Sequence, residues 1–469
     1  MRKWLPLVAV CAGTFMLLVD VTIVTVALPE MAGGLDASLS DLQWVLSAYA
    51  LVLAALVLTS GSIADRVGRR AVYLGGLVGF GAASLACGVS ANVGMLIAAR
   101  GVQGLAAAAM FATTLALIST SYDGRDRGFA FGVWAAVNGA AAAAGPLLGG
   151  LLTDSLGWRW IFLVNLPVCV VAVALTLAVV SESRDPRPRR IDLPGMVSFT
   201  VAAGALVFAL IRDSWGSSLT VALLVVAVVA LVGFVAVERA RPDAMLDLSL
   251  LRSGSFAAVL FTAAMLPAAA WAFLAYQTLW LQSVLGLSPI EAGLVWLPAS
   301  VTTFVVSIAV GRTLHDASPR ALIGTGMLII AAGAFTETAI GAGSDWTVAV
   351  PGLFLVGVGA GLVLGPLSAA AMAAVPGPRA GMAAGAVNTF RQLGFALGIA
   401  VLGAVFRSGL GDSVGKSERE TYADALDLTF LVATGFGLAA VIAVFAFVRP
   451  SRATPTPTPA PTLAGARPR

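Results

Sequence analysis

The chain has 469 residues, of which 59% are hydrophobic and 11% are charged, and its formal net charge at pH 7 is +4. Soluble domains carry about 25% charged residues, so this composition excludes a soluble globular protein and indicates a membrane protein. The basic residues fall in short segments between apolar runs, which argues for the lipid bilayer as a partner and against nucleic acid. One histidine and three dispersed cysteines exclude a metal site built from His and Cys.

Apolar runs long enough to cross a bilayer, about 20 residues each, recur along the whole chain. The first begins after "MRKW" and is too long for the core of a secretion signal, so we expect it to be retained as a span. The sequence predicts fourteen transmembrane helices, at 5–28, 42–62, 71–90, 92–115, 128–152, 160–180, 193–211, 219–237, 254–279, 291–311, 320–341, 346–374, 380–406 and 428–448.

An even number of spans places both termini on the same side of the membrane. With the N-terminus inside, five of the 28 Lys and Arg fall on outer segments and two lie within spans. The other 21, counting Arg320 at the inner end of its span, fall on inner segments. Positively charged loops remain in the cytoplasm. We therefore expect both termini to be cytoplasmic, in the cell membrane of a bacterium.

Two polar breaks with prolines or charges, at 181–195 and 238–255, divide the predicted spans into six, two and six. The two middle spans are poor in glycine, proline and charge, and we expect them to face lipid. The predicted domains are a six-helix bundle at 1–182, two additional helices with linkers at 183–245, a second six-helix bundle at 246–448, and a disordered, Pro/Thr-rich tail at 449–469.

A carboxylate stands inside the first predicted span. An ionised Asp20 would destabilise that position by roughly 2.5–3.5 kcal/mol at a helix centre. In the fourth span, Arg100 and Gln103 are three residues apart and share a helix face, and an arginine there is either functional or snorkels to the surface. Asp20 and Arg100 both lie roughly 12 Å below the outer surface at 1.5 Å per residue, so we expect them to interact.

The loop "GSIADRVGRR" between the second and third spans combines a carboxylate, three guanidinium groups and two glycines that permit a tight turn. An ordinary positively charged inner loop would explain the arginines but not the aspartate or the spacing. The residues that define this loop motif are Gly61, Asp65, Arg66, Gly68, Arg69 and Arg70. A weaker repeat, "GRTLHDASPR" at 311–320, places Asp316 in a similar position but lacks the basic run.

Small residues fill the fifth predicted span, "GAAAAAGPLLGGLL". Gly145 and Gly149 at i,i+4 make a groove for a neighbouring helix, and Pro146 removes a backbone hydrogen bond and bends the span. The motif also includes Gly139 and Gly150. Generic packing of small residues is the alternative explanation of this composition.

Aromatic residues in the ninth span mark a candidate substrate cavity. Phe273, Tyr276 and Trp280 share a face at i, i+3 and i+7, with Gln277 close by. This arrangement suits stacking on planar or cationic compounds, and an aromatic belt at the membrane surface is the alternative.

Two later spans carry polar residues inside the membrane. Asn388 and Arg391 can share a face of the thirteenth span. Glu337 lies roughly 6 Å from the outer end of the eleventh span. Two roles remain open for Glu337, that of an interfacial residue and that of a proton-coupling residue.

Three of these strings resemble signatures of the major facilitator superfamily: G-x-x-x-D-R-x-G-R-R at 61–70, R-x-x-Q-G at 100–104 and G-P-x-x-G-G at 145–150. Together with "VDVTIVTVALP" at 19–29, "WRWIFLVNLP" at 158–167 and fourteen spans, they resemble the fourteen-spanner drug:proton antiporters. The resemblance implies two six-helix bundles that rock around a central site, a loop that latches their inner ends, and Arg100 in proton coupling. The fifth-span signature marks exporters. Thr25 departs from the pattern, because that family often has Asn there.

The sequence therefore predicts a proton-driven exporter of lipophilic, cationic drugs or antibiotics. Asp20 and Arg100 are its expected coupling pair, and the proton gradient is its energy source without any cofactor. We expect a monomer and no enzymatic activity. Candidate cavity residues are Thr25, Gln103, Phe273, Tyr276, Gln277, Asn388 and Arg391.

Three alternatives remain open or are disfavoured. A dedicated exporter of one metabolite or natural antibiotic fits the sequence equally well. The fifth-span signature argues against an importer or facilitator. A membrane-embedded enzyme would need clustered carboxylates for a metal or a catalytic base, and the sequence has no such cluster.

Overall fold

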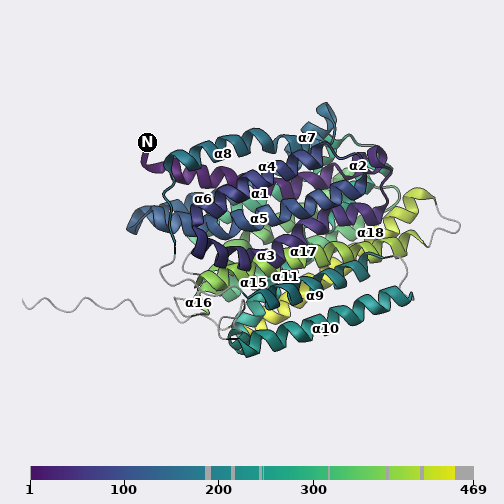
Figure 1. Ribbon diagram of the computed structural model, residues 1–469. Coiled ribbons are helices and arrows are strands. Elements are labelled where there is room, and N and C mark those ends of the chain that lie inside the picture. Colours follow the sequence, from purple (N-terminus) through teal and green to yellow (C-terminus); the bar gives the residue numbers. More distant parts are fainter. Residues whose placement is uncertain are drawn as a thin grey trace, which may run out of the picture.

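The computed structural model describes residues 2–184, 192–212, 217–241, 246, 248–314, 317–375, 380–411 and 417–448, apart from some side chains in 124–143 and at 2, 380 and 381. These residues form helices joined by short connections (Figure 1). The tail at 449–469 and Asp316 lie outside the described residues.

Fourteen long helices account for most of the residues that the structure describes. They are α1 (Leu5–Val26), α3 (Leu39–Val67), α4 (Arg69–Gly88), α5 (Val93–Ser121), α6 (Gly124–Leu156), α8 (Asn165–Val179), α9 (Leu193–Ile211), α10 (Ser218–Ala240), α11 (Gly254–Ala270), α14 (Leu297–Thr313), α15 (Pro319–Thr336), α16 (Ala349–Ala373), α17 (Ala380–Leu410) and α18 (Glu418–Phe447).

Short helical elements lie between the long ones. They are η1 (Arg2–Trp4), α2 (Leu28–Leu35), α7 (Trp160–Leu163), η2 (Leu248–Arg252), α12 (Leu274–Leu279), the π-helical η3 (Trp280–Val284), α13 (Pro289–Val295), η4 (Glu337–Ala339) and η5 (Trp346–Val348).

Every predicted span falls on one helix or on two consecutive helices of the structure. Among the described residues, twelve helices are long and apolar enough to cross a membrane, and α13 with α14, bent by 41°, makes a thirteenth. The remaining predicted span, 128–152, lies on α6, part of which is outside the described side chains.

Several predicted spans are broken where the sequence suggested one continuous helix. The first ends at Val26, and α2 restarts with Pro29 in its first turn. The tenth bends at Trp296, with Pro298 in the first turn of α14. A proline ring disfavours a helical residue before it and removes a hydrogen-bond donor, which accounts for both breaks. The ninth is broken at Trp271–Phe273 and ends in a π-helical turn.

The long helices form two groups that pack side by side (Figure 1). In the first half, α1 packs against α6 and α8, and α5 packs against α3 and α4. In the second half, α16 packs against α14 and α15, and α18 packs against α11, α15 and α17. The halves meet where α3 contacts α17 and where α6 contacts α13 and α14.

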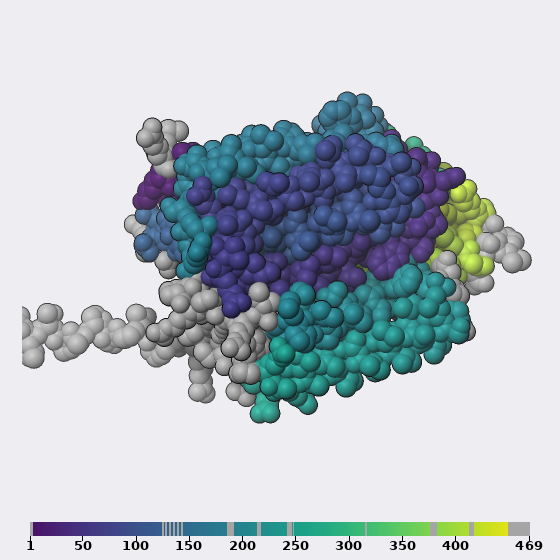
Figure 2. Space-filling model, in the orientation of Figure 1, coloured from purple at the N-terminus to yellow at the C-terminus, as the bar shows by residue number. Residues whose placement is uncertain are grey.

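The α9–α10 pair lies along the edge of the bundle, as a ridge beside the first half (Figure 2). Its inner helix, α9, contacts both α3 and α17, and so covers the seam between the halves. A small apolar cluster of Ala55, Phe199 and Phe234 holds the pair to α3. The outer helix, α10, exposes apolar side chains such as Val228 (60%) and Val232 (63%), as expected of a helix that faces lipid.

The two ends of the bundle differ in the elements that they carry. One end, called the α2 end below, holds α2, α7 and α13. The other, called the α4 end, holds the connection from α3 to α4. Figure 1 shows α2 and α7 together at the end of the bundle opposite the N-terminus.

Candidate functional site

A buried ion pair joins two of the predicted residues. Asp20 of α1 is 0% exposed and Arg100 of α5 is 1% exposed. One guanidinium nitrogen, Arg100 Nη1, lies 2.6 Å from Asp20 Oδ2. The proximity expected from the depth of the two residues is therefore present in the fold.

Two amides complete the surroundings of the Asp20 carboxylate. Gln103 Nε2 donates to Asp20 Oδ1 at 2.9 Å, and Asn165 Nδ2 of α8 donates to the same oxygen at 3.0 Å. Both amides also donate to the hydroxyl of Ser84, at 2.9 and 3.3 Å. Four helices of the first half, α1, α4, α5 and α8, thus converge on one carboxyl group.

The arginine is held as tightly as the aspartate. Arg100 Nε donates to the Val45 carbonyl at 3.0 Å, and Nη1 donates to Gln103 Oε1 at 2.6 Å. Its guanidinium carbon lies 4.3 Å from the ring centre of Tyr49 and 5.9 Å from that of Phe162. Stacking on an aromatic face suits a planar, weakly hydrated guanidinium in an apolar interior.

Every described hydrogen bond of the Asp20 carboxylate comes from a side-chain donor. Three side-chain donors and no acceptor face the Asp20 carboxylate, so its ionised form satisfies all of its described partners. Protonation would remove the charge that pairs with Arg100. Sequence reasoning missed Asn165 and Ser84, although the lone polar Asn165 at the start of an apolar span was a usable signal.

The predicted gating loop is clamped within the first half. Asp65 pairs with Arg69 at 2.9 Å, and the carboxylate of Glu182 accepts the backbone N–H groups of Arg70 and Ala71 at 3.0 and 3.1 Å. A carboxylate at the start of α4 satisfies free N–H groups and the helix dipole. Sequence reasoning did not single out Glu182.

The backbone of this loop explains one of its glycines. Gly68 has φ +133°, a conformation that favours glycine, and a Cβ there would lie 2.6 Å from the Glu182 side chain. Arg66 is exposed, and Gly61 lies in the last turns of α3. Among the described residues, the polar contacts of the loop stay within the first half, so the expected latch between the halves remains a prediction.

The small residues of α6 allow two different close contacts. On one side, a Cβ at Gly145 would lie 1.8 Å from Thr22 Oγ1, and a Cβ at Gly149 would lie 2.8 Å from the Ile23 carbonyl of α1. On the other side, a Cβ at Gly150 would lie 2.5 Å from the Pro289 carbonyl of α13. The motif therefore packs α6 against its own half and against the other half. Gly139 lies on α6, and its surroundings are outside the described part of that helix.

Facing Gly150, the second half contributes a glycine of its own. A Cβ at Gly293 of α13 would lie 2.5 Å from the carbonyl of Pro146. Reciprocal glycines let two helix backbones approach closely. The two halves are thus in backbone contact toward the α2 end.

A polar cluster also joins the halves at the α2 end. Gln43 Nε2 of α3 lies 2.9 Å from the Tyr276 hydroxyl, which donates to the Ile399 carbonyl at 2.5 Å. Arg407 Nη1 of α17 donates to Gln43 Oε1 at 2.5 Å, and its Nη2 donates to the Leu210 carbonyl of α9 at 3.3 Å. The cluster of Gln43, Tyr276 and Arg407 thus ties together both halves and the α9–α10 pair.

The remaining cavity candidates occupy varied positions. Phe273 is fully buried against Phe430 of its own half, with ring centres 5.4 Å apart. Thr25 is buried and donates to the Thr22 carbonyl of its own helix at 2.6 Å. Gln277 is buried and donates to Glu337 at 2.7 Å.

Asn388 and Arg391 are half-buried on α17. The geometry brings Gln103 into the Asp20 network, and the other candidates line no common hollow among those described here.

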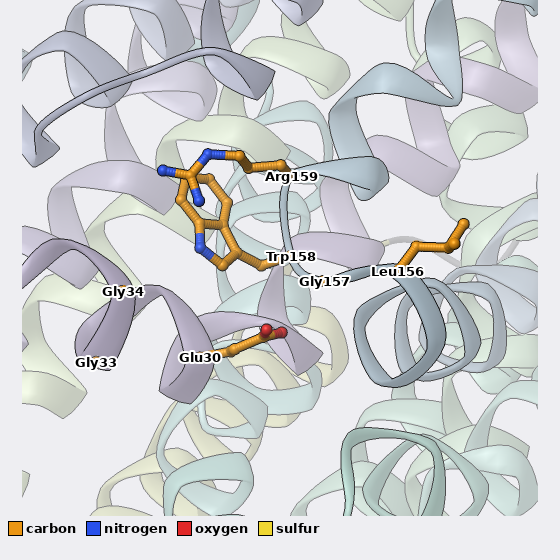
Figure 3. A pocket seen from close by; sticks show the side chains of 7 residues that line it. All are labelled: Glu30, Gly33, Gly34, Leu156, Gly157, Trp158 and Arg159. Carbon is orange, nitrogen blue, oxygen red and sulfur yellow. The ribbon is translucent and has the colours of Figure 1, made fainter.

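A surface hollow of about 400 Å³ opens at the α2 end, between α2 and the connection from α6 to α7. In Figure 3 the Arg159 guanidinium lies over the indole of Trp158, 4.4 Å from the ring centre, and Glu30 stands on the adjacent helix. Partial burial raises the pKa of the Glu30 carboxyl. The lining residues include none of the Asp20 network, so this hollow is separate from the candidate site.

A gap of about 10 Å³ lies beside Gln43 and Tyr276, which is room for about one water molecule. Among the described residues, no group of three His, Cys, Asp or Glu side chains could hold a metal ion.

Comparison with known proteins identifies the family. The model of the Major Facilitator Superfamily matches residues 10–399. The chain is 39% identical over 410 residues to the multidrug resistance protein Stp of Mycobacterium tuberculosis, covering 87% of this chain and 76% of that protein. It is 37% identical over 418 residues to the puromycin resistance protein pur8 of Streptomyces alboniger, covering 86% and 82%.

Solved structures share the architecture at low sequence identity. A D-xylose–proton symporter superposes with a TM-score of 0.67 at 12% identity, covering 96% of this chain and 99% of that one. At this identity the likeness shows the fold alone. The sequence matches and the fold agree: the chain belongs to the major facilitator superfamily, a family of membrane transporters and not of enzymes, and is related to its drug-resistance members.

Proposed function

We propose that this protein is a drug:proton antiporter that exports lipophilic, cationic drugs or antibiotics across the bacterial cytoplasmic membrane. The Asp20–Arg100 pair carries this proposal, because its carboxyl group is a protonatable group that is fully buried among four helices. The names of the relatives, a multidrug and a puromycin resistance protein, support export over import. Protons and a small-molecule substrate are the partners, and the working unit is a monomer.

The proposed topology has fourteen spans with both termini in the cytoplasm. It rests on α6 as the fourteenth span and on the excess of Lys and Arg in the inner segments. In this orientation the α2 end faces outward and the α4 end faces the cytoplasm. The domain limits follow as 1–182, 183–245 and 246–448, with a cytoplasmic tail at 449–469.

The conformation described here is then closed to the outside. Glycine-lined contacts between α6 and α13 and the Gln43–Tyr276–Arg407 cluster close the outer end. Because the Leu210 carbonyl accepts from Arg407, the α9–α10 pair takes part in this outer gate. Its second role is to cover the seam between α3 and α17 from lipid.

The network supplies a coupling step that uses only residues of this chain. A proton that reaches Asp20 from outside neutralises the carboxylate and frees it from Arg100. The guanidinium keeps the Val45 carbonyl and Gln103 Oε1 as acceptors. Rearrangement of α1 against α5 then moves the closing contacts of α6, because α1 and α6 are packed through Gly145 and Gly149. Proton and drug need only favour opposite-facing states.

A dedicated exporter of one natural antibiotic is the second candidate function. The observation in its favour is the 37% identity to a protein named for resistance to a single compound, puromycin. Both functions use the same coupling pair and differ in the breadth of the cavity.

Purified protein in liposomes tests both candidates. Liposomes with an acidic lumen that contain the transporter in inside-out orientation should accumulate ethidium or puromycin. Addition of either probe should also release protons from the lumen. Accumulation that nigericin leaves unchanged would contradict proton coupling. Transport of puromycin without ethidium would favour the dedicated exporter.

A further inference from the structure

The second half holds a buried carboxyl group that the proposed coupling step does not use. Glu337 begins η4, directly after α15, and is 0% exposed. A Cβ at Gly352 of α16 would lie 2.3 Å from Glu337 Oε1. The glycine therefore provides the space in which this carboxyl group sits, inside the bundle and not at its surface.

The carboxyl group faces an amide and no cation. Gln277 Nε2 of α12 donates to Glu337 Oε2 at 2.7 Å. The backbone N–H of Leu353 is also close, but α16 uses it for its own i→i−4 hydrogen bond. Among the described residues, no Lys or Arg lies within 4.0 Å of Glu337, unlike Asp20, which pairs with Arg100.

The other titratable groups on the surrounding helices act elsewhere. The α16 segment has none, and Arg320 of α15 binds the Phe445 carbonyl at the far end of the helix. On α18, Asp424 acts on Asp427, and neither carboxyl group is among those that act on Glu337. The Tyr276 hydroxyl of α12 belongs to the outer gate.

Two buried acceptor atoms at this site lack a hydrogen-bond partner. They are Glu337 Oε1 and Gln277 Oε1, the second oxygen of each group. An unpaired buried carboxylate is strongly destabilising. One proton on the Glu337 carboxyl would remove that charge and supply a donor to the Gln277 carbonyl, so that acid and amide form a closed pair with two hydrogen bonds.

The geometry points to Glu337 and Gln277 as a second proton-binding site, in the second half of the chain, that is filled while the outer end is closed. The link to the gate is short, because Gln277 follows Tyr276 on α12. This six-residue helix lies between the break at Trp271–Phe273 and the π-helical turn, so it can shift as a unit. Loss of the proton would leave a carboxylate that repels the Gln277 carbonyl, and would thereby favour release of Tyr276 from Gln43.

The existence of the site can be tested without any transport. Infrared difference spectra of the purified full-length protein, recorded as a function of pH, should show the C=O band of a protonated acid that is absent in Glu337→Gln. The band should shift in Gln277→Leu, which removes the amide partner. Asp36→Asn is the matched control, because Asp36 is exposed at the end of α2 and its replacement should leave the band unchanged. Identical spectra for wild type and Glu337→Gln would overturn the site.

The link to the gate rests on the proposed function and has its own measurement. In liposomes, Glu337→Gln should fix the closed pair and lower the number of protons released per ethidium taken up, with ethidium binding retained. A wild-type ratio in this variant would overturn the link while leaving the infrared result standing. Failure of wild-type protein to couple ethidium to protons would instead overturn the proposed function, and the infrared band would still decide whether the site exists.

Discussion

Replacing Asp20 by asparagine tests the coupling pair directly. The side chain keeps its size, but the guanidinium of Arg100 loses the oxygen at 2.6 Å and stays 1% exposed. Removing one partner of a buried ion pair costs about 3–5 kcal/mol. Arg100 retains its contacts with the Val45 carbonyl, Gln103 Oε1 and the face of Tyr49. We therefore expect the free energy of unfolding to fall by about 3 kcal/mol, the lower end of that range.

A double-mutant cycle separates this pair from its surroundings. Arg100→Met should also cost about 3–5 kcal/mol, because it leaves the Asp20 carboxylate buried without a cation. Asp20→Asn combined with Arg100→Met should cost less than the sum of the single variants, with a coupling energy of about 3 kcal/mol. Reversible unfolding in mixed detergent micelles measures all three free energies of unfolding.

Two results would refute the reasoning. If the double variant loses as much stability as the two single variants together, the charges do not form a pair in the folded protein. If Asp20→Asn still accumulates ethidium in response to an imposed pH gradient, Asp20 is not the coupling residue, whatever its contribution to stability.

Three further variants test the packing and the gate. Gly150→Leu should force α6 away from the Pro289 carbonyl and destabilise the closed conformation by about 1–3 kcal/mol. A cysteine introduced at the outer end should then react faster with a thiol reagent. Glu182→Gln should remove a charge from the start of α4 and lower stability by about 0.3–1 kcal/mol, measured by thermal unfolding; an unchanged midpoint would contradict the clamp. Arg407→Met should break the hydrogen bond to Gln43 and speed the reaction of the same introduced cysteine, without changing expression. A labelling rate equal to that of the unsubstituted protein would argue against a gate at this position.

Much of the helical fold was predictable, because the length of an apolar run is a local property of the chain. A bilayer requires about 20 apolar residues per helix, and each predicted span lies on one helix or on two consecutive helices. The breaks at Val26–Leu28 and Trp296 were not predicted, although Pro29 and Pro298 were visible. Hydropathy averages over a window and is blind to a proline that bends a helix without changing its polarity.

Part of the site was predictable for a related reason. Asp20 and Arg100 stood out because a charge inside an apolar run is costly, and helix rise placed them at one depth. Their partner Ser84 did not stand out, because uncharged polar residues are common in membrane helices, whereas Asn165 was visible as a polar residue at the start of an apolar span. Depth along one helix also says nothing about which face of another helix will turn toward it.

The sequence by itself determined a helical membrane protein, the positions of its long helices, and the pair of charges in the first half. It could do so because charge and apolar length are read one helix at a time. Only the tertiary structure decided that Gly145 faces α1 while Gly150 faces α13, that Glu182 closes the start of α4, and that Glu337 lies buried against Gln277. Those contacts join residues about 60 to 140 positions apart, and helix packing, which no local pattern encodes, brings them together.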